Sequence, residues 1–307
     1  KKNMIRKILG VNISHDCSVA YFENGVLKEY FEESRFNKIK SFVPPNPFYK
    51  DPYDFQMLKQ YKNIVFDAVV LVSYDRGNIL IEKPYVDNVL RQLNFKDVKF
   101  YQSEHHMFHV MSGFYFSKFN EAIGVTCDGG GEIYKDKLAT VESIYTINKK
   151  EIIPHYKSVT SMRYDYFKNL KDQDYIEKDN YDIRVTNKEI GGLKFLHATT
   201  AAGFDVFQEG QLMGIAAYID KDTNLDKKVL SIAHKAQEET LQERIELIEK
   251  AQQYSTCKNI ILSGGYHLNC SNNFKLVKHF PNINFFVDPI PYDGGTAVGA
   301  AHYYESY

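Results

Sequence analysis

Short apolar runs with the pattern of buried strands recur along this chain, and segments with a helical pattern separate several of them. Asn24-Gly25 lies between the second and third runs, and Asn-Gly at such a position is a strong signal for a β-hairpin. Strands are predicted at residues 5–11, 18–23, 26–32, 65–72, 98–101, 122–127, 140–146, 259–262 and 284–287. Alternation of strands and helices is typical of a layered α/β architecture.

The segments between these runs are less uniform. Helices are predicted at residues 54–62, 83–93, 197–207 and 226–254, the last as one long helix or two. Residues 209–216 hold two glycines, which predict a loop. The polar, Tyr-rich segment 149–187 has only a weak pattern, and it either recognises a substrate or forms a lid.

Composition excludes few classes of function. With 307 residues, the chain is long enough for one large domain or two lobes. A net charge of -1 makes a general nucleic-acid or membrane surface unlikely as a function. The four cysteines, Cys17, Cys127, Cys257 and Cys270, show no CxxC pair, so we expect reduced, partly buried thiols in a cytoplasmic protein. We also expect no signal peptide and no membrane helix.

Three histidines lie within five residues, in the sequence Ser-Glu-His-His-Met-Phe-His of residues 103–109. On a helix, His105 and His109 lie one turn apart on the same face. Two imidazoles at this spacing can bind one metal ion, provided that carboxylates or solvent complete its coordination. The alternative is an ordinary polar helix start, with Ser103 as its N-cap.

Two aspartates beside glycines are the candidate carboxylate ligands. Asp128 follows an apolar run in Cys-Asp-Gly-Gly-Gly-Glu, and Asp293 lies in Pro-Tyr-Asp-Gly-Gly near the C-terminus. An aspartate at the end of a strand beside glycines suits a metal or phosphate site, because glycine lets the backbone approach a ligand closely. The hypothesis is one metal held by two histidines and two aspartates next to a bound phosphate, and a plain hairpin turn is the alternative for the first loop.

Two further loops have the composition of phosphate-binding turns. The first is Asn-Ile-Ser-His-Asp at residues 12–16, which follows the first predicted strand. The second is Ser-Gly-Gly at residues 263–265, between a predicted strand and a helix, an order that lets a helix N-terminus approach a nucleotide. The alternative for the first loop is an ordinary polar turn, and the chain contains no GxxxxGK[ST] motif.

Taken in order, the motifs resemble those of the NodU-like O-carbamoyltransferases, in the domain that these enzymes share with hydrogenase-maturation and tRNA-threonylcarbamoyl transferases. The resemblance covers nearly the whole chain and is weak at about 45–95 and 140–190. The motifs that carry it lie at residues 9–18, 32–40, 105–115, 126–132, 209–214, 262–270 and 291–301. It implies the two-lobed actin-like ATPase fold (ASKHA, ribonuclease H-like), with the first lobe at residues 1–118 and the second at 119–307.

The resemblance also implies a role for particular residues. His105, His109, Asp128 and Asp293 correspond to the family's metal ligands, for a divalent metal that is iron(II) in those proteins. His15 corresponds to an active-site histidine that can act as a general base on an acceptor hydroxyl. Lys40 corresponds to a lysine that meets the nucleotide or the carbamoyl group. The nucleotide-binding residues implied are Asp128, Gly129, Gly130, Gly264, Gly265 and Asn269.

The implied activity is transfer of a carbamoyl group from carbamoyl-adenylate to a hydroxyl of a small molecule or sugar. Many relatives carry a C-terminal domain that makes carbamoyl-adenylate from carbamoyl phosphate and ATP, and we expect a separate domain or protein to do so here. Ser34 and Ser41 depart from the family pattern, which favours an acidic residue and a histidine there. Two other functions stay open: a non-catalytic or partner-dependent nucleotide-binding subunit, and an actin-like-fold kinase or ATPase.

Overall fold

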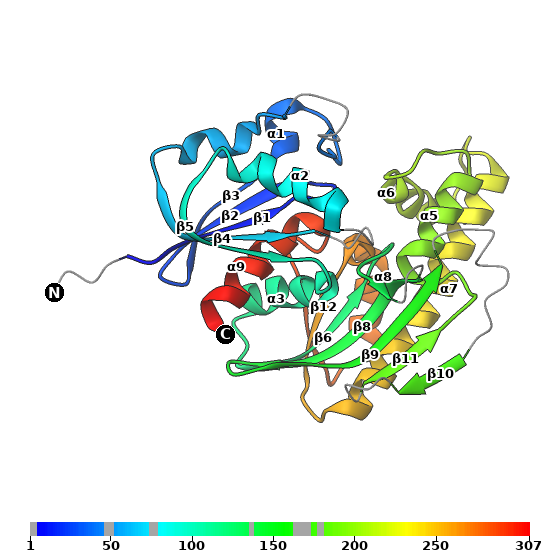
Figure 1. The fold of residues 1–307 in the computed structure, drawn as a ribbon. Helices are drawn as coiled ribbons and strands as arrows, with labels where there is room; N and C mark the ends of the chain where they lie inside the picture. Colours follow the sequence, from blue (N-terminus) through cyan, green and yellow to red (C-terminus); the bar gives the residue numbers. More distant parts are fainter. Residues whose placement is uncertain (1–4, 46–51, 74–78, 135–137, 162–172, 177–180) are drawn as a thin grey trace.

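Two β-sheets form the centre of the molecule (Figure 1). The computed structural model describes residues 5–45, 52–73, 79–134, 138–161, 173–176 and 181–307. The first sheet has the order β3-β2-β1-β4-β5, with β1 (Lys7–Asn12), β2 (Ser18–Glu23), β3 (Val26–Glu32), β4 (Val65–Val72) and β5 (Asn94–Tyr101). β1 to β3 form an antiparallel meander, and β4 and β5 run parallel to β1. The hairpin predicted between β2 and β3 is confirmed, with φ of 50° at Asn24 and 75° at Gly25.

The second sheet has the order β10-β11-β9-β8-β6-β12-β13. Its strands are β6 (Glu121–Cys127), β8 (Leu138–Asn148), β9 (Ile152–Ser161), β10 (Gln173–Ile176), β11 (Asp182–Val185), β12 (Asn259–Ser263) and β13 (Asn284–Val287). The short β7 (Ile133–Tyr134) pairs with β8. β12 runs parallel to β6 and β13, so the loops that follow these three strands leave the sheet at the same edge.

Helices cover both faces of each sheet. On the first sheet, successive residues of a strand, such as Ile8 and Leu9, point to opposite faces and belong to different apolar clusters. The cluster of Leu9 includes residues of η1 (Gln56–Tyr61) and α2 (Ile79–Leu90), and that of Ile8 includes residues of α9 (Thr296–Ser306). The second sheet packs on α3 (His105–Ser117) on one face and on α7 (Lys227–Tyr254) and α8 (Cys270–His279) on the other.

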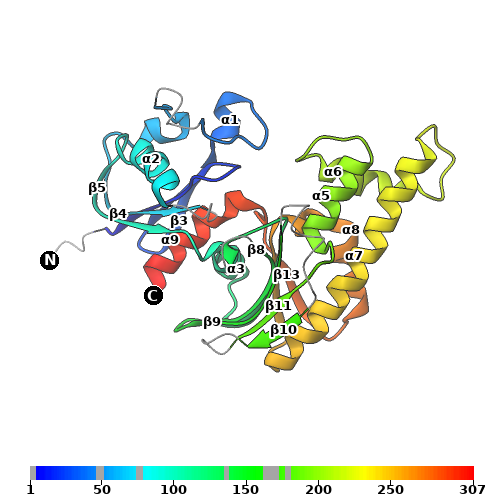
Figure 2. The same ribbon diagram turned by 45° about the vertical axis from the view of Figure 1, so that its right-hand side comes forward.

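As a result, α3 and α9 lie side by side between the two sheets (Figures 1 and 2). They approach closely, because a Cβ on Gly299 of α9 would lie 1.9 Å from the carbonyl oxygen of Phe108 in α3. Each helix packs largely on the sheet of the other half of the sequence: α9 on β1 and β4, α3 on β6 and β12. The predicted boundary between residues 118 and 119 therefore stays a prediction, since contacts across it build the centre of the molecule.

The prediction of a loop at residues 209–216 is wrong. The chain there forms α6 (Glu209–Ile215) and the short η2 (Ala216–Tyr218). Leu212 is buried in a cluster with Phe195 of α5 (Gly191–Ala201), so tertiary packing outweighs the low helix propensity of the two glycines. The helix predicted at 197–207 begins earlier, at Gly191, and ends at Ala201.

The segment 149–187, which had no clear pattern, contributes β9 and β11 and the short β10 to the second sheet. β9 pairs with β8 along most of its length, and β11 runs parallel to β9. Alternating burial in β11, where Ile183 and Val185 are covered, supports its pairing. Residues 162–172 and 177–180 lie outside the described part, so the question of a lid there stays open.

The segment predicted as one helix or two forms the single helix α7 (Lys227–Tyr254). Asp226 is its N-cap residue, and its side chain accepts hydrogen bonds from the backbone N–H groups of Lys228 and Val229. The alternative of two helices is therefore excluded. Among the helices of the described residues, none combines the length and the apolar character needed to cross a membrane.

None of the four cysteines forms a disulfide bond, in line with the prediction of reduced thiols. Cys17 and Cys127 are buried, whereas Cys270 is exposed. Burial raises the pKa of the Cys127 thiol to about 12, so this thiol stays protonated and unreactive at neutral pH.

Replacing Gly10 by alanine tests the packing of α9 on β1. A Cβ at this position would lie 2.0 Å from the carbonyl oxygen of Ala297, so α9 has to move away from the sheet. We expect Gly10→Ala to lower the free energy of unfolding by about 2 kcal/mol or more, measured by urea unfolding. The control is Gly214→Ala, an exposed helical site with open space around it, which should leave stability unchanged or raise it by up to about 1 kcal/mol. Equal stability of the two variants would contradict the described packing.

Candidate metal centre

The first two turns of α3 carry His105 and His109, whose side chains point to one place in the interior. His105 and His109 are both buried, and their Nε2 atoms lie 3.1 Å apart. The spacing of four residues places them on one face of α3, as the sequence predicted. Both Nδ1 atoms are buried without a hydrogen-bond partner. The two rings are therefore held mainly by packing and by the groups near their Nε2 atoms.

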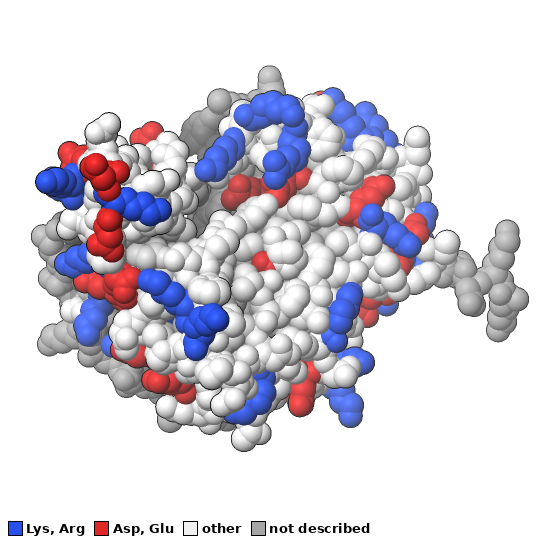
Figure 3. Space-filling model, turned by 180° about the vertical axis from the view of Figure 1, so that it is seen from behind, with Lys and Arg blue, Asp and Glu red and all other residues white. Residues whose placement is uncertain are grey.

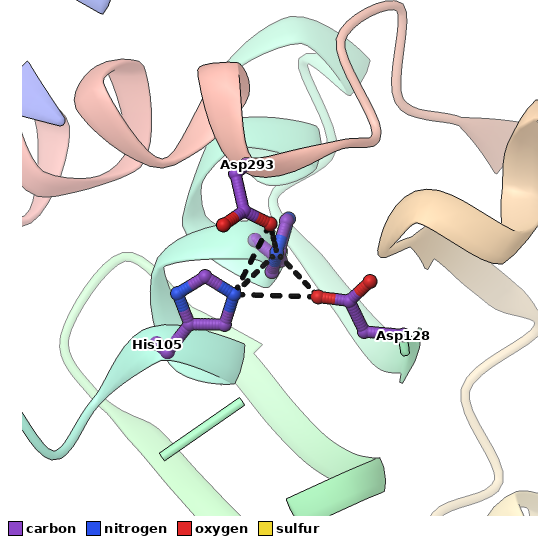
Figure 4. Close-up of side chains that lie close together, drawn as sticks. His105, Asp128 and Asp293 are labelled. Carbon is purple, nitrogen blue, oxygen red and sulfur yellow. Dashed lines mark hydrogen bonds and ion pairs between the residues drawn. The ribbon is translucent and has the colours of Figure 1, made fainter. Parts of the chain in front are cut away.

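Asp128 is the first residue after β6, and one of its carboxylate oxygens faces His105 (Figure 4). Its Oδ2 lies 3.3 Å from His105 Nε2 and 3.4 Å from His109 Nε2. Its Oδ1 accepts hydrogen bonds from the backbone N–H of Gly129 at 2.8 Å and of Gly265 at 3.3 Å. The carboxylate therefore joins the histidine pair to the loops that follow β6 and β12.

Asp293 has the same division of roles (Figure 4). It lies in η4 (Asp293–Gly295), directly before α9. Its Oδ1 lies 3.4 Å from His105 Nε2 and 3.7 Å from His109 Nε2. Its Oδ2 accepts from the Ser14 hydroxyl at 2.9 Å and lies 3.1 Å from His15 Nε2. This carboxylate joins the histidine pair to the loop after β1, residues 12–17, which we call the His15 loop.

The four side chains offer one donor atom each, and these atoms lie within 4.8 Å of one another; we call the set the ligand quartet. Its members are His105, His109, Asp128 and Asp293. The separations between nitrogen and oxygen donors, 3.3 to 3.7 Å, are close to the spacing of about 3.0–3.4 Å for donors that lie about 2.1 Å from a shared metal. Two imidazoles and two carboxylates suit a divalent first-row metal. The residues present therefore fit a metal ion.

Charge in the ligand quartet is unbalanced without a cation. Burial raises the pKa values of Asp128 and Asp293, but the nearby histidines lower them by more, so both carboxyls are ionised. Burial lowers the pKa of His105, but Asp293 and Asp128 raise it to about 10. Two carboxylates packed in the interior attract positive charge, which protons on the histidines or a bound metal can supply.

The third histidine, His106, has a different role. Its Nδ1 contacts the Ser143 hydroxyl at 2.5 Å, and burial lowers its pKa to about 4. Its backbone N–H donates to Glu132 Oε2 at 3.1 Å, and Lys157 Nζ lies 2.8 Å from Glu132 Oε1. Glu132, in the loop between β6 and β7, thus caps the start of α3. The alternative that made Ser103 the N-cap is wrong on that point: Glu104 is the N-cap residue, and its side chain makes no capping hydrogen bond.

His15 lies beside the ligand quartet without belonging to it. Its Nδ1 lies 2.9 Å from Asp16 Oδ2, and its Nε2 faces Asp293. Burial lowers the pKa of His15, but Asp293 and Asp16 raise it to about 9. On its other side, the ring lies 5.1 Å from that of Phe207, measured between centroids.

Lys40 is exposed, and its Nζ lies 3.3 Å from the carbonyl oxygen of Phe207. The segment after β3 and the segment before α6 therefore meet at Phe207, which has an unusual φ of 68°. Figure 3 shows a hollow between the first lobe and the part formed by α5 and α6, with Lys and Arg side chains near its edge. The structure brings Lys40 near the His15 side of the site and does not place it in the ligand quartet.

The glycines predicted to bind nucleotide lie in the loops after β6 and β12, at the edge of the second sheet where Asp128 also lies. Gly129 and Gly130 follow Asp128, and Gly264 has φ of 89°. A Cβ on Gly264 would lie 2.2 Å from the carbonyl oxygen of Cys127, so close approach of two loops is sufficient reason for this glycine. Gly265 donates its N–H to Asp128, as described above.

Asn269 has a structural role in the described protein. It is buried, caps α8, and exchanges two side-chain hydrogen bonds with Gln237, both at 2.9 Å. Its amide is therefore engaged within the protein. The nucleotide-binding role predicted for Asn269 stays a prediction.

Several residues of the site carried no role in the sequence reasoning. Ser14 and Asp16 flank His15, and their contacts with Asp293 and His15 follow from that position. Glu132 follows the three glycines after Asp128, whereas the sequence around Lys157 and Phe207 gives no signal, because their partners are distant in sequence.

Comparison with known proteins finds one family model and two curated proteins with similar sequences. Residues 156–302 match the sequence model of the family described as "Carbamoyltransferase N-terminus". A protein from Synechocystis sp., "Uncharacterized protein sll1178", is 25% identical, and the match covers 96% of this chain and 56% of that protein. "Nodulation protein NolNO" from Sinorhizobium fredii is 26% identical over 64% of this chain and 30% of its own length. The chain thus spans about half, or less, of the length of these relatives.

Solved structures show the fold. Full-length HypF, in its phosphate- and nucleotide-bound form, has a TM-score of 0.51 at 12% identity, covering 98% of this chain and 55% of HypF. A ROK family glucokinase from Streptomyces griseus, in complex with glucose and AMPPNP, also has a TM-score of 0.51 at 12% identity, covering 96% of this chain and 98% of the kinase. The protein has the α/β fold of the actin-like ATPases, as predicted. The family-model match over residues 156–302 supports the carbamoyltransferase family that the motifs predicted, whereas the solved structures show the fold alone.

Metal analysis tests the ligand quartet. We expect wild-type protein purified without chelator, or reconstituted with iron(II), to hold about one equivalent of metal, since two imidazoles and two carboxylates suffice for one ion. His109→Ala removes one ligand and should abolish tight binding, measured by elemental analysis after gel filtration.

The matched control is His106→Asn, because asparagine can keep the contact that His106 Nδ1 makes with Ser143. This variant should retain the metal. Full metal content in His109→Ala, or equal loss in both variants with intact folds, would contradict the assignment of the ligand quartet.

Proposed function

We propose that this chain transfers a carbamoyl group from carbamoyl-adenylate to a hydroxyl oxygen of a small molecule or sugar. The observation that carries the proposal is the meeting of the His15 loop, the glycine loops and the ligand quartet at two shared carboxylates, Asp128 and Asp293. Loops suited to phosphate thus lie beside a possible base and a possible metal. The family match supports the transferred group.

The chemistry sets what the residues have to do. Carbamoyl-adenylate is a mixed anhydride, so the acceptor oxygen forms a bond to the carbamoyl carbon while the bond from that carbon to the phosphate oxygen breaks. AMP leaves, and the hydroxyl proton has to go to a base. A divalent metal, by the resemblance iron(II), would be held by the ligand quartet and would supply positive charge for the carbamoyl oxygen and the departing phosphate.

His15 is the proposed base. Its Nε2 lies 3.1 Å from Asp293 Oδ2, and Asp16 holds its Nδ1 at 2.9 Å. This arrangement orients the ring as a carboxylate orients the histidine of a catalytic pair. Asp293 is the strongest of the charges that raise the His15 pKa, so neutralising Asp293 lowers that pKa toward the range in which Nε2 accepts a proton.

The donor is proposed to lie along the glycine loops. Gly129 and Gly265 donate their N–H groups to Asp128, so the N–H groups of Gly130 and Gly264 in the same loops are proposed to bind the phosphate. Lys40 is proposed to meet the nucleotide or the carbamoyl group after leaving the Phe207 carbonyl, a single exposed contact at 3.3 Å. Formation of carbamoyl-adenylate from carbamoyl phosphate and ATP is assigned to a separate domain or protein.

A partner-dependent nucleotide-binding subunit is the second candidate. The glycine loops and the actin-like fold would serve nucleotide binding in such a subunit as well. Chemically supplied carbamoyl-adenylate separates the two, because a transferase acts on it without a partner. The likeness to a kinase rests on the fold alone, and the ligand quartet gives no reason to expect phosphoryl transfer to a sugar.

The experiment supplies iron(II)-loaded protein with carbamoyl-adenylate and a panel of sugars and other alcohols. We expect release of AMP and addition of one carbamoyl group to an acceptor, both followed by mass spectrometry. His15→Ala should keep metal and AMP binding but lower the transfer rate by about 100-fold or more, the usual contribution of a general base.

The control is His155→Gln. His155 contacts Thr146 of β8, which pairs with Ile123 near the start of β6, at the opposite end from Asp128. This variant should transfer at the wild-type rate. Normal turnover by His15→Ala would exclude His15 as the base, and nucleotide binding without turnover in the wild type, across all acceptors, would favour the subunit.

A further inference from the structure

Asp288 is a buried carboxylate that the proposed reaction does not use. It follows β13 and is 2% exposed. Its backbone N–H donates to the Leu262 carbonyl at 3.0 Å, and its Oδ1 accepts from the N–H of Ile290 at 2.9 Å. Its Oδ2 is buried without a hydrogen-bond partner. A buried carboxylate oxygen without a partner is destabilising, so a partner outside the described contacts is expected.

The free oxygen of Asp288 lies against α3, just beyond the ligand quartet. A Cβ on Gly113 of α3 would lie 3.8 Å from Asp288 Oδ2. Ser112 precedes Gly113, and its buried hydroxyl also has no hydrogen-bond partner. Both Ser112 and His109 act on the Asp288 carboxyl: burial raises its pKa to about 7, while the Ile290 N–H, the Ser112 hydroxyl and the His109 charge oppose that rise.

His109 supplies the third unpaired atom of this region. Its Nε2 faces the other members of the ligand quartet, and its Nδ1 is buried without a hydrogen-bond partner. Ser112 lies three residues further along α3, on the same face of the helix. A histidine that binds metal through Nε2 carries its proton on Nδ1 and donates that proton to an acceptor, commonly a carboxylate or a hydroxyl.

We propose that Asp288, acting through the Ser112 hydroxyl, is the outer carboxylate that orients His109 for metal binding. In this relay the His109 Nδ1–H donates to the hydroxyl, and the hydroxyl donates to Asp288 Oδ2. All three unpaired atoms are then satisfied by one another. Asp288 is a positioning residue, and the inference rests on the metal site of the proposed function.

The test measures cobalt(II) affinity, by competition with a chelating dye, in wild type, Asp288→Asn, Ser112→Ala and Glu33→Gln. Asparagine keeps the shape of Asp288 but not its charge, and we expect it to weaken cobalt binding by about 10- to 100-fold, as loss of such a partner does elsewhere. Ser112→Ala should weaken binding as well. Glu33 is the control, because this buried carboxylate binds backbone N–H groups of Gln56 and Met57 in the first lobe.

Thermal unfolding of the metal-free proteins separates positioning from a structural role. Asp288→Asn replaces a buried carboxylate, one of whose oxygens has no hydrogen-bond partner, by a neutral amide. The metal-free variant should therefore melt at or above the melting temperature of the wild type, although the variant binds cobalt more weakly. Unchanged affinity in Asp288→Asn and Ser112→Ala, with cobalt bound by the wild type, overturns this inference alone. Affinity loss that only accompanies a lower melting temperature also overturns it. Absence of cobalt binding in the wild type overturns the ligand quartet and this inference with it.

Discussion

Two carboxylates that each divide their oxygens between different partners hold the site together. Asp128 has one oxygen toward the histidine pair and the other on the backbone of two glycine loops. Asp293 has one oxygen toward the same histidines and the other on Ser14 and His15. Because both groups are buried and ionised, their separation from solvent has to be offset by these hydrogen bonds and by positive charge.

The fold makes this meeting possible through its two central helices. α3 packs on the second sheet and α9 on the first, and the two contact each other between the sheets. α3 carries the histidines, and Asp293 lies directly before α9. The loops after β1, β6 and β12 follow the carboxyl ends of parallel strands, where α/β folds place their ligands. A change that moves α9 from β1 therefore moves a ligand of the candidate metal site.

Local patterns predicted most strands to within a few residues, including the hairpin at Asn24-Gly25. They failed where packing outweighs propensity. α6 forms despite two glycines because Leu212 is buried against α5, and the strands of 149–187 form because β8 offers a pairing edge. Glu132 and Lys157 were missed for the same reason: each binds a partner more than twenty residues away.

The sequence by itself determined the kinds of group that the site contains. The four-residue spacing of His105 and His109 sets them on one face of a helix, and the order of the motifs predicted a family that the match over residues 156–302 supports. Only the tertiary structure decided which groups meet. Asp293 lies 188 positions after His105, and its glycine neighbours made it a candidate ligand without showing that it meets the histidines. Which side chains share a buried point depends on how the two sheets enclose α3 and α9, since long-range packing sets these distances.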